Sequence, residues 1–216
     1  MAGTAGFRLP EQMLGRQRYQ GTPVVSVIIP TSNSENVLTP TLAALVSGAA
    51  TGHVREVIVA DAGSQDGTAE IADIAGCDFF SAPGPLAQRL RAAASRARSP
   101  WLMFLRAGVV LDPHWLEESG RFIQHMEARG DVGCAAMFRR AQDFQVRSSV
   151  LAEVSAALRT ALARPHPEQG LLISKRLYDE LGGHRESANP EADLLATLGR
   201  RRTVVLRSGV TLTRQG

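Results

Sequence analysis

Residues 57–68 read VIVADAGSQDGT, an apolar run rich in β-branched residues that ends at an aspartate and continues into a glycine-containing turn. Residues 25–33, VSVIIPTSN, have the same organisation, since an apolar run there also ends in a polar turn. Continuous apolar runs of this length are typical of strands that are buried on both faces, as in parallel sheets. The two stretches therefore predict two strands of a parallel sheet with polar turns at their carboxyl ends.

Helical and extended patterns alternate along the rest of the chain. Strands joined by helices through short connections favour a parallel sheet with right-handed crossovers. Ligands bind such sheets beyond the carboxyl ends of the strands, which directs attention to loops 30–35, 61–68 and 106–112. Helices are predicted at 36–46, 66–75, 86–97, 114–128, 148–163, 175–181 and 190–198, and strands at 24–29, 54–60, 77–81, 101–105, 132–138, 170–174, 203–206 and 210–213.

Length and composition predict one globular domain. The chain has 216 residues, of which 44% are hydrophobic and 21% charged, and this balance excludes a disordered chain. No apolar run approaches the ~20 residues of a membrane-spanning helix, and the N-terminus lacks the apolar region of a secretory signal. Two cysteines are too few for a disulfide scaffold, so a cytoplasmic location is expected.

Arginine dominates the basic residues, because the chain contains a single lysine, Lys175. Arginine forms forked hydrogen bonds with carboxylates and phosphates, although genome composition is the simpler explanation of its abundance. Aromatic residues make up only 5% of the chain, which argues against a nucleic-acid-binding platform of stacking rings.

The turn at residues 61–68 could bind a ligand. Gly63 and Gly67 allow a close approach of the backbone, and the start of the following helix offers N–H groups to an anion. Asp61 could accept hydrogen bonds from a base or a ribose hydroxyl. The alternative is a plain capped turn, and the stretch matches neither the dinucleotide-binding glycine motif nor a Walker loop.

Four blocks in the same order, residues 25–33, 57–68, 99–108 and 169–183, resemble a family 2 glycosyltransferase with the GT-A fold. The chain is similar in particular to short bacterial members described as selenodomain-associated transferases, over residues 23–213. The resemblance implies a GT-A-like (Rossmann-like) α/β domain, with a mostly parallel sheet flanked by helices. It also implies transfer of a sugar, with inversion, from a nucleoside-diphosphate-sugar to a hydroxyl acceptor. Residues 1–22 would then be a poorly structured lead, 23–110 the nucleotide-binding half and 111–216 the acceptor half.

The resemblance also assigns substrate contacts. Gln169, within Glu168-Gln169-Gly170, would donate or accept a hydrogen bond at a sugar hydroxyl. The nucleotide pocket would include Pro30, Thr31 and Asn33, with Asp61 against the base and Ser64 near the nucleotide.

The chain departs from the family at the metal-binding motif. Similar enzymes carry Asp-x-Asp after the fourth strand, where this chain has Arg106-Ala107-Gly108. Divalent metals prefer oxygen ligands, so we expect no metal at this loop and no cofactor. Arg106, with Arg89 and Arg91 on the preceding helix, would supply the positive charge that a diphosphate leaving group needs. The alternative is that these arginines lie on solvated faces and that the site has decayed.

The second departure concerns the catalytic base. Similar enzymes begin an acceptor-side helix with a Glu-Asp pair, and the matching stretch here is Asn189-Pro190-Glu191-Ala192-Asp193. Alignment places Glu191 at the position of the base, with Asp193 as a nearby alternative. Both carboxylates could instead simply stabilise the start of a helix.

The acceptor is not identified by the sequence. Residues 148–164 form an amphipathic pattern that could lie on the inner face of a membrane and reach a lipid-linked acceptor. Packing against the sheet, or a homodimer contact, explains the same apolar stripe more simply.

Two functional hypotheses remain open. The first is a glycosyltransferase that uses Glu191 as base and arginines in place of a metal. The second is a catalytically inactive GT-A-like binding or assembly protein, favoured by the missing Asp-x-Asp carboxylates and by the proline before Glu191. A nucleotidyltransferase is disfavoured because residues 31–35 contain no Gly, Lys or Arg where a basic, glycine-rich loop would be expected.

Overall fold

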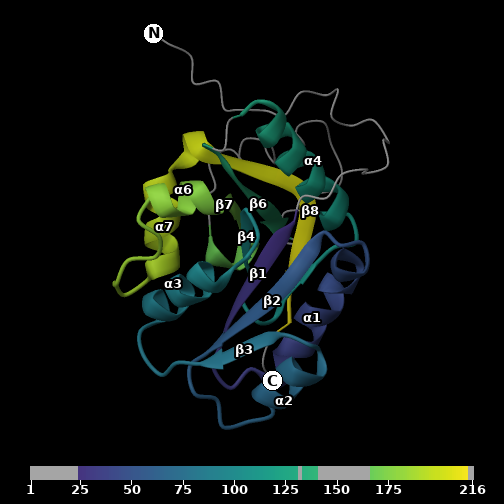
Figure 1. The fold of residues 1–216 in the computed structure, drawn as a ribbon, viewed down its shortest axis with the longest axis vertical. Coiled ribbons are helices and arrows are strands. Elements are labelled where there is room, and N and C mark those ends of the chain that lie inside the picture. The colour runs from purple at the N-terminus through teal and green to yellow at the C-terminus, as the bar shows by residue number, and fades with distance from the viewer. Residues whose placement is uncertain (1–23, 131–132, 141–165, 214–216) are drawn as a thin grey trace, which may run out of the picture.

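The computed structural model describes residues 24–130, 133–140 and 166–213 (Figure 1). The predicted N-terminal lead and the amphipathic stretch at residues 148–164 lie outside these ranges. Within them, no helix is long and apolar enough to cross a membrane.

The first half of the fold alternates strands and helices. Its elements are β1 (Val25–Thr31), α1 (Glu35–Ala50), β2 (Val54–Asp61), α2 (Thr68–Ile74), β3 (Asp78–Ser81), α3 (Leu86–Arg96) and β4 (Trp101–Phe104). Predicted and observed bounds here agree within a few residues, because long apolar runs separated by polar turns leave little choice of register.

The second half is less regular. Its elements are β5 (Val109–Leu111), α4 (Trp115–Ala128), β6 (Ala135–Arg140), the 3₁₀ turn η3 (Pro167–Gln169), β7 (Leu171–Ser174), α6 (Lys175–Glu180), α7 (Pro190–Leu198), η4 (Arg200–Arg202) and β8 (Thr203–Leu212). The bounds of α7 are those predicted, since Asn189 caps its first turn by accepting a hydrogen bond from the Ala192 N–H and Pro190 occupies the first helical position.

All eight strands form one sheet in the order β3-β2-β1-β4-β7-β6-β8-β5. The pairings among β3, β2, β1 and β4 are parallel, as is that between β6 and β8. Strand β7 is antiparallel to both of its neighbours, and β5 is antiparallel to β8. The prediction of a mostly parallel sheet flanked by helices is confirmed.

Two details of the strand prediction were wrong. Segments 203–206 and 210–213 are not separate strands, because β8 runs without a break from Thr203 to Leu212. The polar residues between them accompany an irregularity in the register between β6 and β8 instead of ending the strand. Strand β5 was not predicted, since three residues carry too little periodicity to be recognised.

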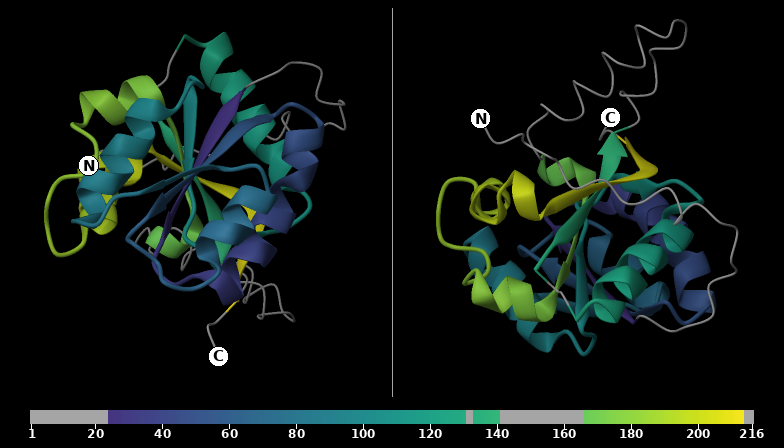
Figure 2. Two further views of the ribbon diagram at one scale, coloured as in Figure 1. Left: turned by 60° about the horizontal axis from the view of Figure 1, so that its bottom comes forward. Right: turned by 90° about the horizontal axis from the view of Figure 1, so that it is seen from above.

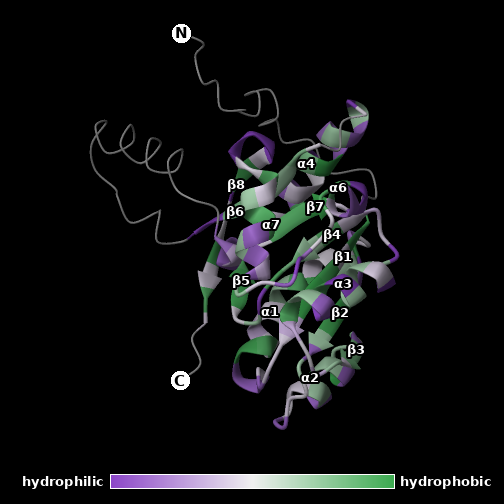
Figure 3. Ribbon diagram, turned by 90° about the vertical axis from the view of Figure 1, so that its left-hand side faces the viewer, coloured by the Kyte–Doolittle hydropathy of each residue, from purple (hydrophilic) through white to green (hydrophobic). Residues whose placement is uncertain are grey.

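Helices cover both faces of the sheet. Side chains alternate along β1, so that Val27 and Ile29 join the core beneath α1, α2 and α4, while Ile28 joins the core beneath α3, α6 and α7. Figures 1 and 2 show the two helical layers on either side of the twisted sheet, and Figure 3 shows that the strands between them are largely apolar. This burial accounts for the continuous apolar runs in the sequence.

The chain order of the strands reverses at β1. Strand β2 lies on one side of β1, whereas β4, reached only after β3 and α3, lies on the other. In open α/β sheets such a reversal leaves a crevice at the carboxyl ends of the two strands. The loop after β4 packs against α1, where the Gly108 N–H donates to Thr41 Oγ1 at 2.9 Å. The crevice is the position at which a ligand site is expected.

Candidate functional site

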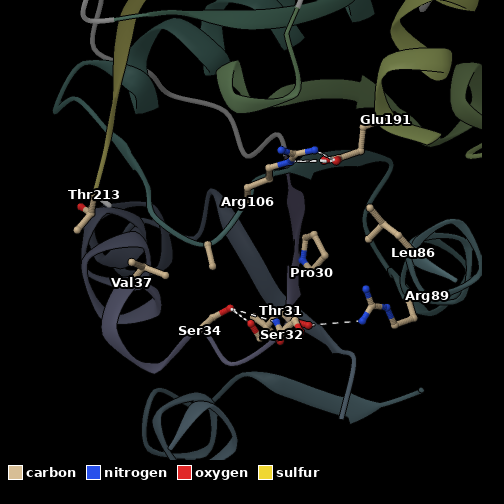
Figure 4. A pocket seen from close by; sticks show the side chains of 11 residues that line it. Pro30, Thr31, Ser32, Ser34, Val37, Leu86, Arg89, Arg106, Glu191 and Thr213 are labelled. Carbon is tan, nitrogen blue, oxygen red and sulfur yellow. Dashed lines mark hydrogen bonds and ion pairs between the residues drawn. The ribbon is translucent and has the colours of Figure 1, made fainter. Parts of the chain in front are cut away.

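A cavity of about 310 Å³ opens at the carboxyl ends of β1 and β4 (Figure 4). Its size lies at the lower end of the range for small-molecule sites, about 300–1,000 Å³. Arg89, Arg106 and Glu191 supply its charged side chains. The remaining lining residues are Pro30, Thr31, Ser32, Ser34, Val37, Leu86, Ala107 and Thr213. Of the ten residues predicted to form the site, five line this cavity: Pro30, Thr31, Arg89, Arg106 and Glu191.

The loops after β1 and β2 are joined by hydrogen bonds between their tips. The Asn33 N–H donates to Ser64 Oγ at 2.8 Å, and Asn33 Oδ1 accepts from the Gln65 N–H at 2.9 Å. The Ser34 N–H donates to Thr68 Oγ1 at 2.8 Å. Asn33 and Ser64, both predicted to contact the nucleotide, therefore hold the two loops together.

The start of α2 is occupied by neighbouring carboxylates. The Gly67 N–H donates to Glu35 at 2.9 Å, and the Thr68 N–H donates to Asp66 at 3.1 Å. Asp66, which precedes α2 by two residues, also accepts a hydrogen bond from the Glu35 N–H at the start of α1. The expectation that this helix terminus offers free N–H groups to an anion was wrong for Gly67 and Thr68.

Asp61 is buried, and its carboxylate accepts four hydrogen bonds. Thr31 Oγ1 and Ser64 Oγ donate to Oδ1 at 2.8 and 2.5 Å, while the N–H groups of Gly63 and Ser64 each donate to Oδ2 at 2.7 Å. Burial by itself would raise the pKa of Asp61, but these hydrogen bonds outweigh it and hold the pKa below its ordinary value. Asp61 is thus an ionised anchor of the turn, and the cavity lining does not include it.

Arg106 and Glu191 form an ion pair across the cavity (Figure 4). Arg106 Nε donates to both Glu191 oxygens, at 2.9 and 3.1 Å, and Arg106 Nη2 also donates to Oε2. Hydrogen bonds to Glu191 raise the pKa of Arg106, which outweighs the opposing effect of burial. The residue predicted to bind the diphosphate and the residue predicted to be the base are therefore each other's partners.

Arg89 is nine-tenths buried in the cavity wall, although it carries a charge. Its Nη1 makes a long 3.5 Å hydrogen bond to the Thr31 carbonyl. No described residue accepts a hydrogen bond from its Nε. Burial lowers the pKa of Arg89, and the charge of Asp61 partly opposes this effect. A buried guanidinium with an unsatisfied N–H is costly unless a ligand supplies the missing acceptor.

Arg91 and Gln169 lie outside the cavity lining. Arg91 is half exposed on α3 and lies 3.7 Å from Glu186, in the loop before α7. Gln169 accepts a hydrogen bond from the His166 N–H at 2.9 Å and donates one to the Phe138 carbonyl at 3.0 Å. In this conformation both ends of the Gln169 amide stabilise the fold.

The loop that leads into α7 is anchored by a buried histidine. His184 Nδ1 lies 2.8 Å from the Tyr178 hydroxyl, and its ring meets Phe104 of β4 edge to face. Burial lowers the pKa of His184 to about 4, so the ring is neutral near pH 7. These contacts hold the start of the loop that connects α6 to α7, the helix that carries Glu191.

The loop after β4 is fixed by the end of β8. The Thr213 N–H donates to the Gly108 carbonyl at 2.8 Å, and Gly108 has a φ of +92°. A Cβ at Gly108 would lie 2.8 Å from the Thr213 carbonyl oxygen. Thr213 lines the cavity from more than a hundred residues away, and no sequence signal pointed to it. Ser32 and Ser34 lie in a loop that the sequence did single out, although they were not named.

The residues at this loop do not fit a divalent metal. Arg106-Ala107-Gly108 offers a cation and no side-chain oxygen, and the cavity's one carboxylate, Glu191, already pairs with Arg106. Within residues 24–130, 133–140 and 166–213, no group of three or more His, Cys, Asp and Glu side chains could hold a metal ion.

Solved structures with the same architecture share little sequence with this chain. Glucosyl-3-phosphoglycerate synthase from Mycobacterium tuberculosis, in complex with phosphoglyceric acid, superimposes with a TM-score of 0.64 at 18% identity, covering 90% of this chain and 73% of that one. S. aureus TarS 1–349 gives 0.59 at 16% identity, covering 86% and 59%. Mannosyl-3-phosphoglycerate synthase from Rubrobacter xylanophilus gives 0.58 at 16% identity, covering 89% and 67%. A search of curated proteins finds no match.

These neighbours share the GT-A fold, which confirms the predicted fold. The family assignment rests on the sequence. The sequence model of the family described as "Glycosyl transferase family 2" matches residues 26–179, which is more than half of the chain. The chain belongs to glycosyl transferase family 2.

Proposed function

We propose that the chain transfers a sugar from a nucleoside-diphosphate-sugar to a hydroxyl acceptor in the cavity between β1 and β4. Family membership supports the class of reaction. The observation that carries the assignment to this cavity is Arg89, a buried guanidinium in the wall whose Nε lacks an acceptor among the described residues. A diphosphate would supply that acceptor as a charge-assisted hydrogen bond.

The proposed reaction is a direct displacement with inversion. The acceptor oxygen forms a bond to the anomeric carbon as the bond from that carbon to the diphosphate oxygen breaks. The electron pair of the broken bond leaves with the nucleoside diphosphate, and the acceptor's hydroxyl proton passes to Glu191. Glu191 is the only carboxylate among the described cavity-lining residues, whereas Asp193 is exposed two residues further along α7.

We propose further that guanidinium groups provide the charge that stabilises the leaving diphosphate. A structure of the M. tuberculosis synthase is described as a complex with Mn²⁺ and uridine-diphosphate-glucose. In this chain Arg106 follows β4 and Arg89 lies in the facing wall. Preorganised cations of this kind stabilise developing negative charge without a metal. Arg91 is the weaker candidate for this role because it lies outside the cavity lining and beside Glu186.

The nucleotide is proposed to lie along β1, where Pro30 and Thr31 line the cavity. Contacts from Asp61 and Gln169 would require their present hydrogen bonds to break. Asn33 and Ser64 would act mainly by holding the loops in place.

The second candidate function is a catalytically inactive binding protein. The Arg106–Glu191 pair favours it, since hydrogen bonds from Arg106 occupy both oxygens of the predicted base. This candidate predicts no turnover with any sugar nucleotide.

Nucleotide binding tests the proposal directly. Thermal unfolding would be followed with UDP, GDP, CDP, dTDP and ADP, each with EDTA and with added Mg²⁺ or Mn²⁺. Saturation at 100 times the dissociation constant stabilises the native state by ~2.7 kcal/mol, which shifts the melting temperature by a few degrees. We expect one nucleotide to stabilise the protein in EDTA, and its sugar conjugate to be turned over without metal.

Two results would count against the proposal. Stabilisation that appears only with Mg²⁺ or Mn²⁺ would refute the metal-free mechanism. Binding without turnover, across a panel of sugars and acceptors, would favour the inactive candidate.

A further inference from the structure

The ion pair in the cavity joins two groups that the proposed function needs apart. Arg106 follows β4 and Glu191 lies in the first turn of α7, 85 residues later in the chain. Both Glu191 oxygens accept hydrogen bonds from Arg106. With this pair formed, Arg106 Nε and Nη2 are not available to bind a diphosphate. The Glu191 oxygens are likewise not available to accept a proton from a hydroxyl group.

We propose that the donor diphosphate displaces Glu191 from Arg106, so that donor binding itself releases the catalytic base. This inference rests on the proposed function and adds to it that donor binding precedes the release of Glu191. Diphosphate oxygens replace the carboxylate on Arg106 Nε and Nη2. Glu191 then takes the acceptor's hydroxyl proton as the acceptor oxygen bonds to the anomeric carbon and the sugar–diphosphate bond breaks. Without donor, the base stays masked and no acceptor is activated.

The surroundings of Glu191 suit a partner that can be exchanged. In the described part of the chain, the hydrogen bonds to its carboxylate come from Arg106. The Arg106 side chain is 37% exposed, so an anion entering from the cavity can reach it. A released Glu191 would remain in the first turn of α7, where the helix dipole stabilises a carboxylate.

A second arginine–glutamate pair, Arg98 and Glu56, lies away from the cavity and serves as a comparison with Arg106 and Glu191. Glu56 accepts hydrogen bonds from the Arg98 side chain, from the Arg98 N–H at 2.7 Å and from Ser26 Oγ at 2.6 Å. Its carboxylate is held from several directions and lies outside the cavity lining. Glu191 lacks such additional support among the described residues, which is the difference expected of a contact that opens.

The test is a double-mutant cycle on binding of the diphosphate group. Titration calorimetry in EDTA would measure UDP and inorganic pyrophosphate binding to the wild type, Glu191→Gln, Arg106→Gln and the double variant. Removing the competing carboxylate should tighten binding of both probes by about tenfold. The gain should be much smaller in the Arg106→Gln background, where only the charge repulsion between Glu191 and the diphosphate is relieved.

Glu117→Gln serves as the matched control, since Glu117 also pairs with an arginine, Arg121, on α4 away from the cavity. It should bind both probes as the wild type does. Far-ultraviolet circular dichroism and urea unfolding would verify that each variant is folded.

The outcomes separate the two proposals. Equal or weaker binding to Glu191→Gln, with clear binding to the wild type, would overturn the displacement and leave the proposed function standing. A gain of the same size in the Arg106→Gln background would also overturn it. Failure of the wild type and all variants to bind either probe, or any other nucleoside diphosphate, would overturn both proposals.

Discussion

The two sides of the cavity differ in how completely their buried polar groups are hydrogen-bonded. On the β1–β2 side, Asp61 accepts four hydrogen bonds, and the loop tips are tied by further bonds through Asn33 and Ser64. On the side formed by α3, the β4 loop and α7, the described residues offer Glu191 hydrogen bonds from Arg106 and offer Arg89 Nε no acceptor. One side is a saturated scaffold, whereas the other holds charges that a ligand can rearrange.

This contrast separates residues that hold the site from residues that act on a ligand. Buried groups whose hydrogen-bonding capacity is full contribute stability and resist change. Buried cations with incomplete partners cost stability and persist where function uses them. The predictions below test the contrast, beginning with the largest expected effect.

Asp61→Asn should destabilise the scaffold side by about 3 kcal/mol. An amide has a single acceptor oxygen, so either its NH₂ group faces the Gly63 and Ser64 N–H groups, or the two hydroxyls that now donate to Oδ1 must turn and accept from it. Urea unfolding measures the loss, with the exposed Asp73→Asn on α2 as control. A change below about 0.5 kcal/mol would contradict the anchoring role.

Low pH should remove the stability that the ionised Asp61 contributes to the folded state. The folded-state pKa of Asp61 lies below its unfolded value of 3.8, so its contribution is present above pH 3.8 and is lost as pH falls through the folded pKa. The Asp61→Asn variant should therefore lose less stability than the wild type as pH falls below about 4.

Gly108→Ala should cost about 2–3 kcal/mol and displace the Arg106 loop. The new Cβ would meet the Thr213 carbonyl oxygen at 2.8 Å on a backbone with φ of +92°. Gly63→Ala is the matched control, since its φ is +95° but nothing lies within 4 Å of its Cβ. That variant should lose only about 1 kcal/mol, the cost of the backbone conformation alone. Equal losses would mean that the contact with Thr213 does not constrain the loop.

Arg89→Gln should weaken UDP binding by about 10- to 100-fold, because a buried charge-assisted contact is lost. Arg91→Gln should weaken it by less than about threefold, since Arg91 is half exposed and lies beside Glu186. Calorimetry on both variants makes the comparison. A larger loss of UDP affinity in Arg91→Gln than in Arg89→Gln would indicate that Arg91 contacts the diphosphate.

Asn33→Ala should cost about 1 kcal/mol. It removes the acceptor for the Gln65 N–H and places alanine at a φ of +47°, a region in which asparagine is better tolerated. Asn33→Asp keeps the acceptor and should stay closer to the wild type. Thermal unfolding distinguishes the two, and equal stability of the alanine variant would show that the loop tie contributes little.

The sequence predicted the first half of the fold closely. Apolar runs at 24–29, 54–60 and 101–105 became β1, β2 and β4, since strands buried on both faces must be apolar throughout. It did not predict β5, because three residues carry little periodicity, and it divided β8 in two, because the continuity of that strand depends on partners far away in the chain. The resemblance to family 2 glycosyltransferases selected Arg89, Arg106 and Glu191, which the structure brings to one cavity.

What the sequence by itself determined was the alternation that builds a parallel sheet, the family, and the presence of Arg106-Ala107-Gly108, without a carboxylate, after the fourth strand. Only the tertiary structure decided which of these side chains meet: that Arg106 pairs with Glu191, that Asp61 accepts four hydrogen bonds, and that Thr213 lines the cavity. The physical reason is that periodicity and propensity act between near neighbours in the chain. The pairing of charges depends instead on distances set by packing between segments that lie up to about a hundred residues apart.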